Sequence, residues 1–211
     1  MKPILSISMP QPDTDRKAAV LRTIMLPSLL GLALTLMGCI VTSVHPFYAE
    51  NDVIYDPALA AVWVEVDAKG EPDSWTFEKA GEKKYKLTIA EQNNRTEYDA
   101  RLFKMKDQLF LDFLPIERRD GFVPVHSLLR VTQIEPTLKM AVFSSEWLEE
   151  FLSTNPAAIR HAMVPKPDDA TKHEIVLTAE TKDLQEFVHR HLNDEGAFKK
   201  ADEMKRRENK K

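Results

Sequence analysis

The chain contains a single cysteine, Cys39, among its 211 residues. One cysteine can form neither an internal disulfide nor a thiolate metal site, so both kinds of framework are excluded for this chain. A thiolate is also a good nucleophile for alkylation. The chemistry open to Cys39 therefore depends on the segment in which it lies.

Cys39 ends a segment that has the parts of a secretory signal. Arg16, Lys17 and Arg22 supply a basic region, residues 24–37 form an uncharged apolar run, and a small residue precedes the cysteine. An apolar run of about fourteen residues is shorter than the roughly twenty that cross a bilayer as a helix. The segment predicts secretion, and an N-terminal transmembrane anchor is the alternative.

The end of this segment, Leu36-Met37-Gly38-Cys39, resembles the lipobox of bacterial lipoproteins. The resemblance implies that a signal peptidase recognises Leu36 and Gly38 and cuts before Cys39. It also implies that diacylglycerol is attached to the Cys39 thiol and that the new amino terminus is acylated. Met37 departs from the Ala, Ser or Thr that is usual there, and Ile40, which is not Asp, implies sorting to the outer membrane. We expect a protein of the bacterial cell envelope with a covalent lipid and no other cofactor.

The composition after the signal predicts one ordinary domain, with a tether before it whose apolar residues could lie along the domain and a polar tail after it. We expect a signal peptide over residues 1–38, a lipidated tether over 39–56, a β-rich globular domain over 57–195 and a charged flexible tail over 196–211. Pro46 and Pro57 favour an extended tether. The tail is rich in Lys and Arg and has few apolar residues, so it is expected to fray.

Short segments of aromatic and β-branched residues follow one another through the domain and predict strands. They cover residues 63–66, 74–78, 85–89, 97–105, 108–113, 127–134, 137–143 and 172–178. Helical spacing of apolar residues predicts a short helix over 145–155, with Ser145 as its cap, and an amphipathic helix from Thr181. Residues 163–171 are expected to form a loop. The fold class is therefore mainly β, an antiparallel meander of about 7 or 8 strands curled into a small barrel or a strongly twisted sheet.

The residues Ala61-Val62-Trp63, at the start of the first strand, resemble the Gly-x-Trp opening of lipocalin-like barrels, with Ala61 in place of Gly. The resemblance implies that Trp63 lies at the closed end of a barrel and that an arginine from a late strand, here Arg130, stacks on it. Small barrels either fill their interior or hold one small ligand. The candidates for the lining of such a cavity, or for a filled core, are Trp63, Trp75, Phe77, Tyr85, Phe103, Phe110, Phe113 and Arg130.

The remaining polar residues predict neither a catalytic site nor a metal site. The six histidines show no His-x-x-x-His spacing, and His189 and His191 would point about 160° apart on a helix. No Gly-x-Ser-x-Gly motif occurs. Asp112 lies among apolar residues, where it is either a carboxylate with a raised pKa or the outward residue of an alternating strand. We favour the outward position.

The charge balance is acidic, with 29 Lys and Arg against 33 Asp and Glu and a net charge of -4. This is the wrong sign for a general nucleic-acid binder. We expect a membrane-anchored envelope lipoprotein that displays a non-catalytic domain, for interaction with an envelope protein or for structural support. The alternatives are a lipocalin-like carrier of a small apolar ligand and an unidentified hydrolase.

Overall fold

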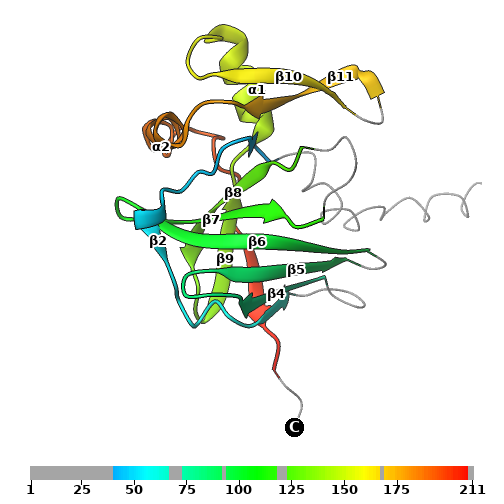
Figure 1. Ribbon diagram of the computed structural model, residues 1–211, viewed down its shortest axis with the longest axis vertical. Coiled ribbons are helices and arrows are strands. Elements are labelled where there is room, and N and C mark those ends of the chain that lie inside the picture. The colour runs from blue at the N-terminus through cyan, green and yellow to red at the C-terminus, as the bar shows by residue number, and fades with distance from the viewer. Residues whose placement is uncertain (1–39, 67–72, 92–93, 118–122, 167–168, 209–211) are drawn as a thin grey trace, which may run out of the picture. The chain divides into compact units, whose positions relative to one another are not determined.

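The computed structural model describes residues 40–66, 73–91, 94–117, 123–166 and 169–208 (Figure 1). Leu36, Gly38 and Cys39 lie outside the described residues, so cleavage and lipidation stay predictions. Within the described part of the chain, no helix combines the length and the apolar character needed to cross a bilayer.

Eight strands form a closed antiparallel barrel, which confirms the predicted fold class. In barrel order they are β8 (His126–Gln133), β7 (Gln108–Pro115), β6 (Asn94–Met105), β5 (Tyr85–Glu91), β4 (Ser74–Lys79), β3 (Val62–Glu65), β12 (Asp202–Arg206) and β9 (Thr137–Val142). The barrel closes where β9 pairs with β8. Closure leaves no unpaired strand edge along the barrel wall, which removes the edge problem of an open sheet.

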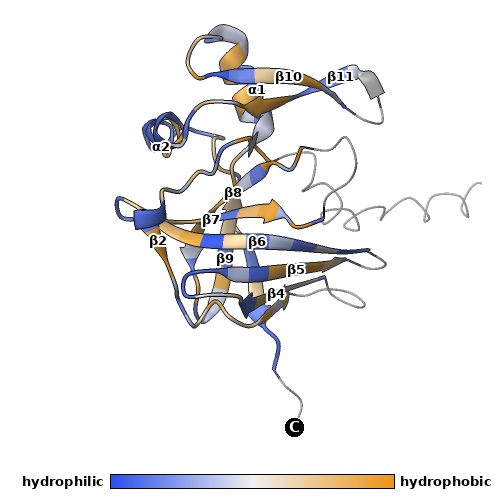
Figure 2. Cartoon of the chain, viewed as in Figure 1, coloured by the Kyte–Doolittle hydropathy of each residue, from blue (hydrophilic) through white to orange (hydrophobic). Residues whose placement is uncertain are grey.

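Alternate residues of each barrel strand point inward and form one hydrophobic core. Along β5, Tyr85 and Leu87 are fully buried while Lys86 between them is partly exposed. Figure 2 accordingly shows hydrophobic and hydrophilic residues on the same strands, as along β5, β6 and β7. Neighbouring strands place their inward residues side by side, as in the pairs Leu87 with Tyr98 and Leu111 with Leu129. The alternation read from the sequence thus corresponds to the two faces of the barrel wall.

A second hydrophobic core covers the outside of the wall formed by β6, β7 and β8. Its covering elements are β2 (Val53–Ile54), α1 (Ser145–Thr154), β11 (Asp169–Leu177) and α2 (Thr181–Arg190). Beside them, β1 (Thr42–Ser43) lies between β8 and β11, a short 3-10 helix (Glu50–Asp52) precedes β2, and β10 (His161–Lys166) pairs with β11. Because β7 is covered on both faces, four consecutive residues are buried there, from Phe110 to Phe113. Strands covered on both faces read as continuous rather than alternating apolar runs.

The two helices begin and end near the predicted positions. The cap of α1 is Ser144 rather than Ser145, because the Ser144 Oγ accepts a hydrogen bond from Trp147 N at 3.3 Å. The buried residues of α2 are Leu184, Phe187 and Val188, which form the predicted apolar stripe.

Three segments expected to be irregular are parts of the fold. The predicted loop over residues 163–171 is too long, because β10 runs to Lys166 and β11 starts at Asp169. The expected tail contains β12, which fills the space between β3 and β9 and buries Met204. The expected tether contributes Val41, Phe47 and Val53 to the outer core. In each case strand pairing across the chain supplies backbone hydrogen bonds that local sequence does not reveal.

Candidate functional site

The interior of the barrel holds most of the predicted cavity-lining residues. Trp63 and Tyr85 are fully buried, Phe77 is almost so, and Trp75 packs against them from a partly buried position. The indole Nε1 of Trp63 donates a hydrogen bond to Leu59 O at 3.0 Å, which satisfies its polar atom inside the core. These large side chains, with the leucines and methionines around them, occupy the interior as a packed core.

Tyr85 carries a hydroxyl into this packed core. Its hydroxyl donates to Asp56 O at 2.9 Å and accepts from Asp56 N at 2.7 Å. Burial raises the pKa of the Tyr85 phenol to about 12, against the lowering effect of the Asp56 backbone. The phenol therefore stays protonated at neutral pH and joins the segment before β3 to the barrel.

Three predicted lining residues lie on the other side of the wall. The Phe103 and Phe110 side chains belong to the outer core, where their rings stack with centroids 5.5 Å apart. Arg130 alternates with the inward residues Leu129 and Val131, so it also faces outward, where its Nη2 donates to Gln108 Oε1 at 2.6 Å. The expected stacking of Arg130 on Trp63 is wrong, because the two residues occupy opposite faces of the barrel wall.

A buried carboxylate and a histidine pair on this outer face. Asp112 is 1% exposed, and its Oδ1 lies 2.7 Å from His126 Nδ1. The other oxygen, Oδ2, accepts a hydrogen bond from Phe47 N at 2.9 Å. Asp112 thus points away from the barrel interior, as predicted, but the N-terminal segment covers its side chain. Sequence reasoning missed the pair because β7 and β8 bring together residues 14 positions apart.

Tyr48 and Arg101 extend this polar group along the outer wall. The Tyr48 ring meets His126 edge-on at 6.5 Å between centroids, and the Arg101 guanidinium lies 6.0 Å from the same ring. Burial raises the pKa of the Tyr48 phenol, Arg101 opposes the rise, and the Asp112 carboxylate adds to it. Four polar side chains from four different segments therefore share one partly buried patch.

A carboxylate that holds a histidine supplies two of the three members of a hydrolytic triad, so the neighbouring hydroxyl decides what this pair can do. Ser43 lies opposite His126 in the β1–β8 ladder. Its Oγ donates to Leu177 O at 3.2 Å, accepts from His45 N at 3.2 Å, and is fully buried. The hydroxyl is thus committed to the backbone. The contacts of the pair favour a structural role, which is to hold Phe47 and its segment against the barrel.

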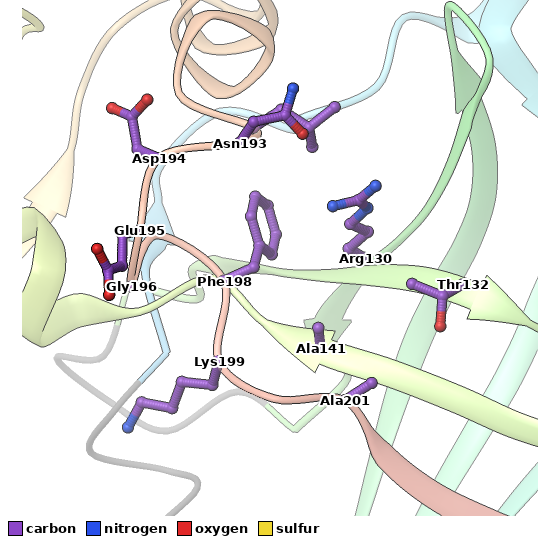
Figure 3. Close-up of a pocket in the computed structure, with 11 residues that line it drawn as sticks. Arg130, Thr132, Ala141, Asn193, Asp194, Glu195, Gly196, Phe198, Lys199 and Ala201 are labelled. Carbon is purple, nitrogen blue, oxygen red and sulfur yellow. The ribbon is translucent and has the colours of Figure 1, made fainter.

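A surface pocket of about 400 Å³ lies outside the barrel wall, between β8, β9 and the segment that follows α2 (Figure 3). In Figure 3 the Phe198 ring stands in the middle of the lining residues, below Asn193 and beside Arg130. The Arg130 guanidinium lies 6.0 Å from the centroid of that ring. The volume falls within the range of about 300 to 1,000 Å³ that is usual for small-molecule sites. A planar group on Phe198 and an oxygen acceptor facing Arg130 would suit this arrangement.

Two charged residues at the rim of the pocket, Asp194 and Lys199, are already paired. Asp194 Oδ2 lies 2.6 Å from His191 Nδ1, and Lys199 Nζ lies 3.0 Å from Glu146 Oε2. His191 is 9% exposed and packs against Trp147, Phe151 and Phe187, with ring centroids 4.6 to 5.3 Å away. His191 is therefore a buried histidine whose Nδ1 has a hydrogen-bond partner.

No group of three or more histidine, cysteine, aspartate or glutamate side chains able to hold a metal ion occurs among the residues that the structure describes. No family model matches the chain, and neither the search of curated proteins nor that of solved structures finds a match.

Proposed function

We propose that this protein is a lipid-anchored component of the bacterial cell envelope that displays a non-catalytic β-barrel domain. The observation that carries the proposal is the Leu36-Met37-Gly38-Cys39 motif at the end of the apolar signal segment. The position of the motif supports it further. Val41, only two residues after the cysteine, is fully buried in the outer core, so the domain starts where the signal ends.

The barrel supports a role in interaction or structural support. Its interior is packed with Trp63, Tyr85 and other large side chains, and three of its strands are covered by a second core. The buried Asp112–His126 pair fastens the N-terminal segment to this wall. A rigid scaffold of this kind suits a protein that presents a fixed surface to another envelope component.

Incorporation of labelled palmitate tests the anchor. The wild-type protein should take up the label in a bacterial host, whereas a Cys39→Ser variant should not and should keep its 38 leading residues. The uncut variant should therefore run heavier on a gel. Equal incorporation into both proteins, or into neither, would refute the lipoprotein assignment.

A lipocalin-like carrier of a small apolar ligand is the second candidate, favoured by the closed barrel and by the pocket around Phe198. Because the interior is packed, the ligand of such a carrier would sit against the outer wall. Native mass spectrometry of residues 40–211 distinguishes the two. A stoichiometric bound lipid that is lost in Phe198→Ser would favour the carrier, and a mass without ligand would favour the display domain.

A further inference from the structure

The residues that directly follow Cys39, Ile40 and Val41, are already paired with the sheet. Ile40 forms an antiparallel bridge with Ser144, and Val41 N donates a hydrogen bond to Phe143 O at 3.0 Å. Thr42 and Ser43 then lie between β8 and β11. Adjacent Cα atoms are 3.8 Å apart, so a lipid on Cys39 would be attached within one residue of a rigid sheet.

The antiparallel bridge also sets the direction in which the chain leaves the fold. Going backward from Val41 to Ile40 follows β9 in the direction that leads to α1. The opposite end of β9 is Thr137, seven residues before Ser144, which at about 3.3 Å per residue is about 23 Å away. Glu135 lies just beyond that end, where it pairs with Arg206 at 3.3 Å. The anchor therefore emerges at the α1 end of the barrel.

An apolar strand edge lies close to the same point. β1 pairs with β11, and β11 pairs with β10, which is the last strand at this side of the sheet. Thr42 and Ala162 both lie opposite Val176, so two strand spacings, or about 10 Å, separate them. The next residues of β10, Met163 and Val164, are 56% and 38% exposed. In Figure 1, β10, β11 and α1 lie together at the end opposite the C-terminus.

The segment that follows α2 contacts Ser144 on the side opposite Ile40. Ser144 N donates to Ala197 O at 2.9 Å, and the exposed residues Glu195 and Lys200 flank this contact along the chain. We name the exposed residues Met163, Val164, Glu195 and Lys200 the anchor-side face. It combines apolar side chains with charges of both signs, a composition that suits the polar headgroup layer of a membrane.

We propose that the anchor-side face lies in the headgroup layer of the membrane that holds the lipid on Cys39. This inference depends on the lipidation proposed above. The headgroup layer of each leaflet is about 5 to 8 Å thick. A residue joined directly to the lipidated cysteine must lie in or beside that layer, and so must surfaces within about 10 Å that face the same way. The domain would then stand on the membrane in one orientation, with the Glu135 end directed away.

Single-cysteine labelling of the full-length lipoprotein tests this orientation. Cys39 is the only natural cysteine, and its thiol would be consumed by the lipid, so an introduced cysteine is the one reactive thiol. Met163→Cys and Glu195→Cys place an environment-sensitive fluorophore on the anchor-side face. Glu135→Cys and Arg207→Cys are matched controls on exposed positions at the far end. The proteins are reconstituted in phosphatidylethanolamine and phosphatidylglycerol vesicles that carry a headgroup spin label.

Quenching at Met163 and Glu195 should exceed quenching at the two controls at least twofold. Equal quenching at all four positions, or stronger quenching at Glu135 and Arg207, would overturn the proposed face while palmitate incorporation still supports the anchor. Failure to incorporate palmitate would instead refute the lipoprotein proposal, and the proposed face with it.

A linker variant tests whether the short connection sets the orientation. Twenty Gly and Ser residues, preceded by a second Ile that preserves the residue after Cys39, are inserted before Ile40. Palmitate incorporation should persist, and the difference in quenching between the two ends should fall below twofold. An undiminished difference would overturn the argument from the short connection.

Discussion

Replacement of Asp112 by alanine should destabilise the domain by about 3 to 5 kcal/mol. The substitution removes the acceptor of the Phe47 N–H at 2.9 Å and the partner of His126 at 2.7 Å. A buried donor left without an acceptor costs about 1 to 3 kcal/mol, and loss of a hydrogen bond to a charged group costs about 1.5 to 3 kcal/mol. Because Asp112 is 1% exposed, water cannot replace the lost carboxylate without opening the outer core.

Two control substitutions separate the charge and the hydrogen bonds from surface effects. Asp112→Asn keeps the shape and one oxygen acceptor, so it should cost only about 1 to 2 kcal/mol. Asp99→Ala breaks an ion pair with Lys84 at 2.6 Å, but both side chains are about a third exposed, and the cost should stay below about 1 kcal/mol. From most to least stable, the expected order of the variants is therefore Asp99→Ala, Asp112→Asn and Asp112→Ala.

Urea unfolding of residues 40–211, followed by tryptophan fluorescence, measures these differences, and hydrogen exchange at the Phe47 amide reports the local contact. Asp112→Ala should speed exchange at Phe47 more than Asp99→Ala does. A loss below about 1 kcal/mol would refute the structural role. A gain in stability would show that the carboxylate is held at a cost to folding, as functional groups often are.

Further predictions concern the barrel itself and use the same unfolding assay. Trp63→Ala should cost about 3 to 5 kcal/mol because the side chain is fully buried, and a cost below about 1 kcal/mol would place it at the surface. Tyr85→Phe should cost about 1 to 3 kcal/mol, since it leaves the Asp56 N–H and C=O unpaired, whereas Tyr55→Phe, stacked on the same ring, should be nearly neutral. Burial raises the pKa of the Tyr85 phenol to about 12, so the folded state keeps a proton that the unfolded chain loses near pH 10. The free energy of unfolding should therefore fall as pH rises from about 10 through 12, and it should fall less steeply in Tyr85→Phe. Truncation before Asp202 should open the barrel between β3 and β9 and abolish cooperative unfolding, and an unchanged transition would show that β12 is dispensable.

The sequence determines the strands whose residues alternate and the helices whose apolar residues repeat at helical spacing. Tyr85 and Leu87 point inward as their spacing predicts, and the α2 stripe is buried as expected. These features are local, because side-chain direction follows directly from backbone geometry. The signal segment predicted to end at Cys39 rests on a local pattern in the same sense, since a linear motif needs no fold to be recognised.

The tertiary structure alone decides what covers each face of the barrel wall. Periodicity places Asp112 outward but does not show that the N-terminal segment buries it. The resemblance to lipocalin-like barrels predicts that Arg130 stacks on Trp63, whereas in the fold Arg130 faces outward and borders an open pocket. Periodicity also cannot show that a charged segment around Met204 completes the barrel, because one inward apolar residue in a short strand leaves almost no pattern. Barrel closure and the second core arise from pairings between residues far apart in the chain, and the free energy of those pairings appears only when both partners are in place.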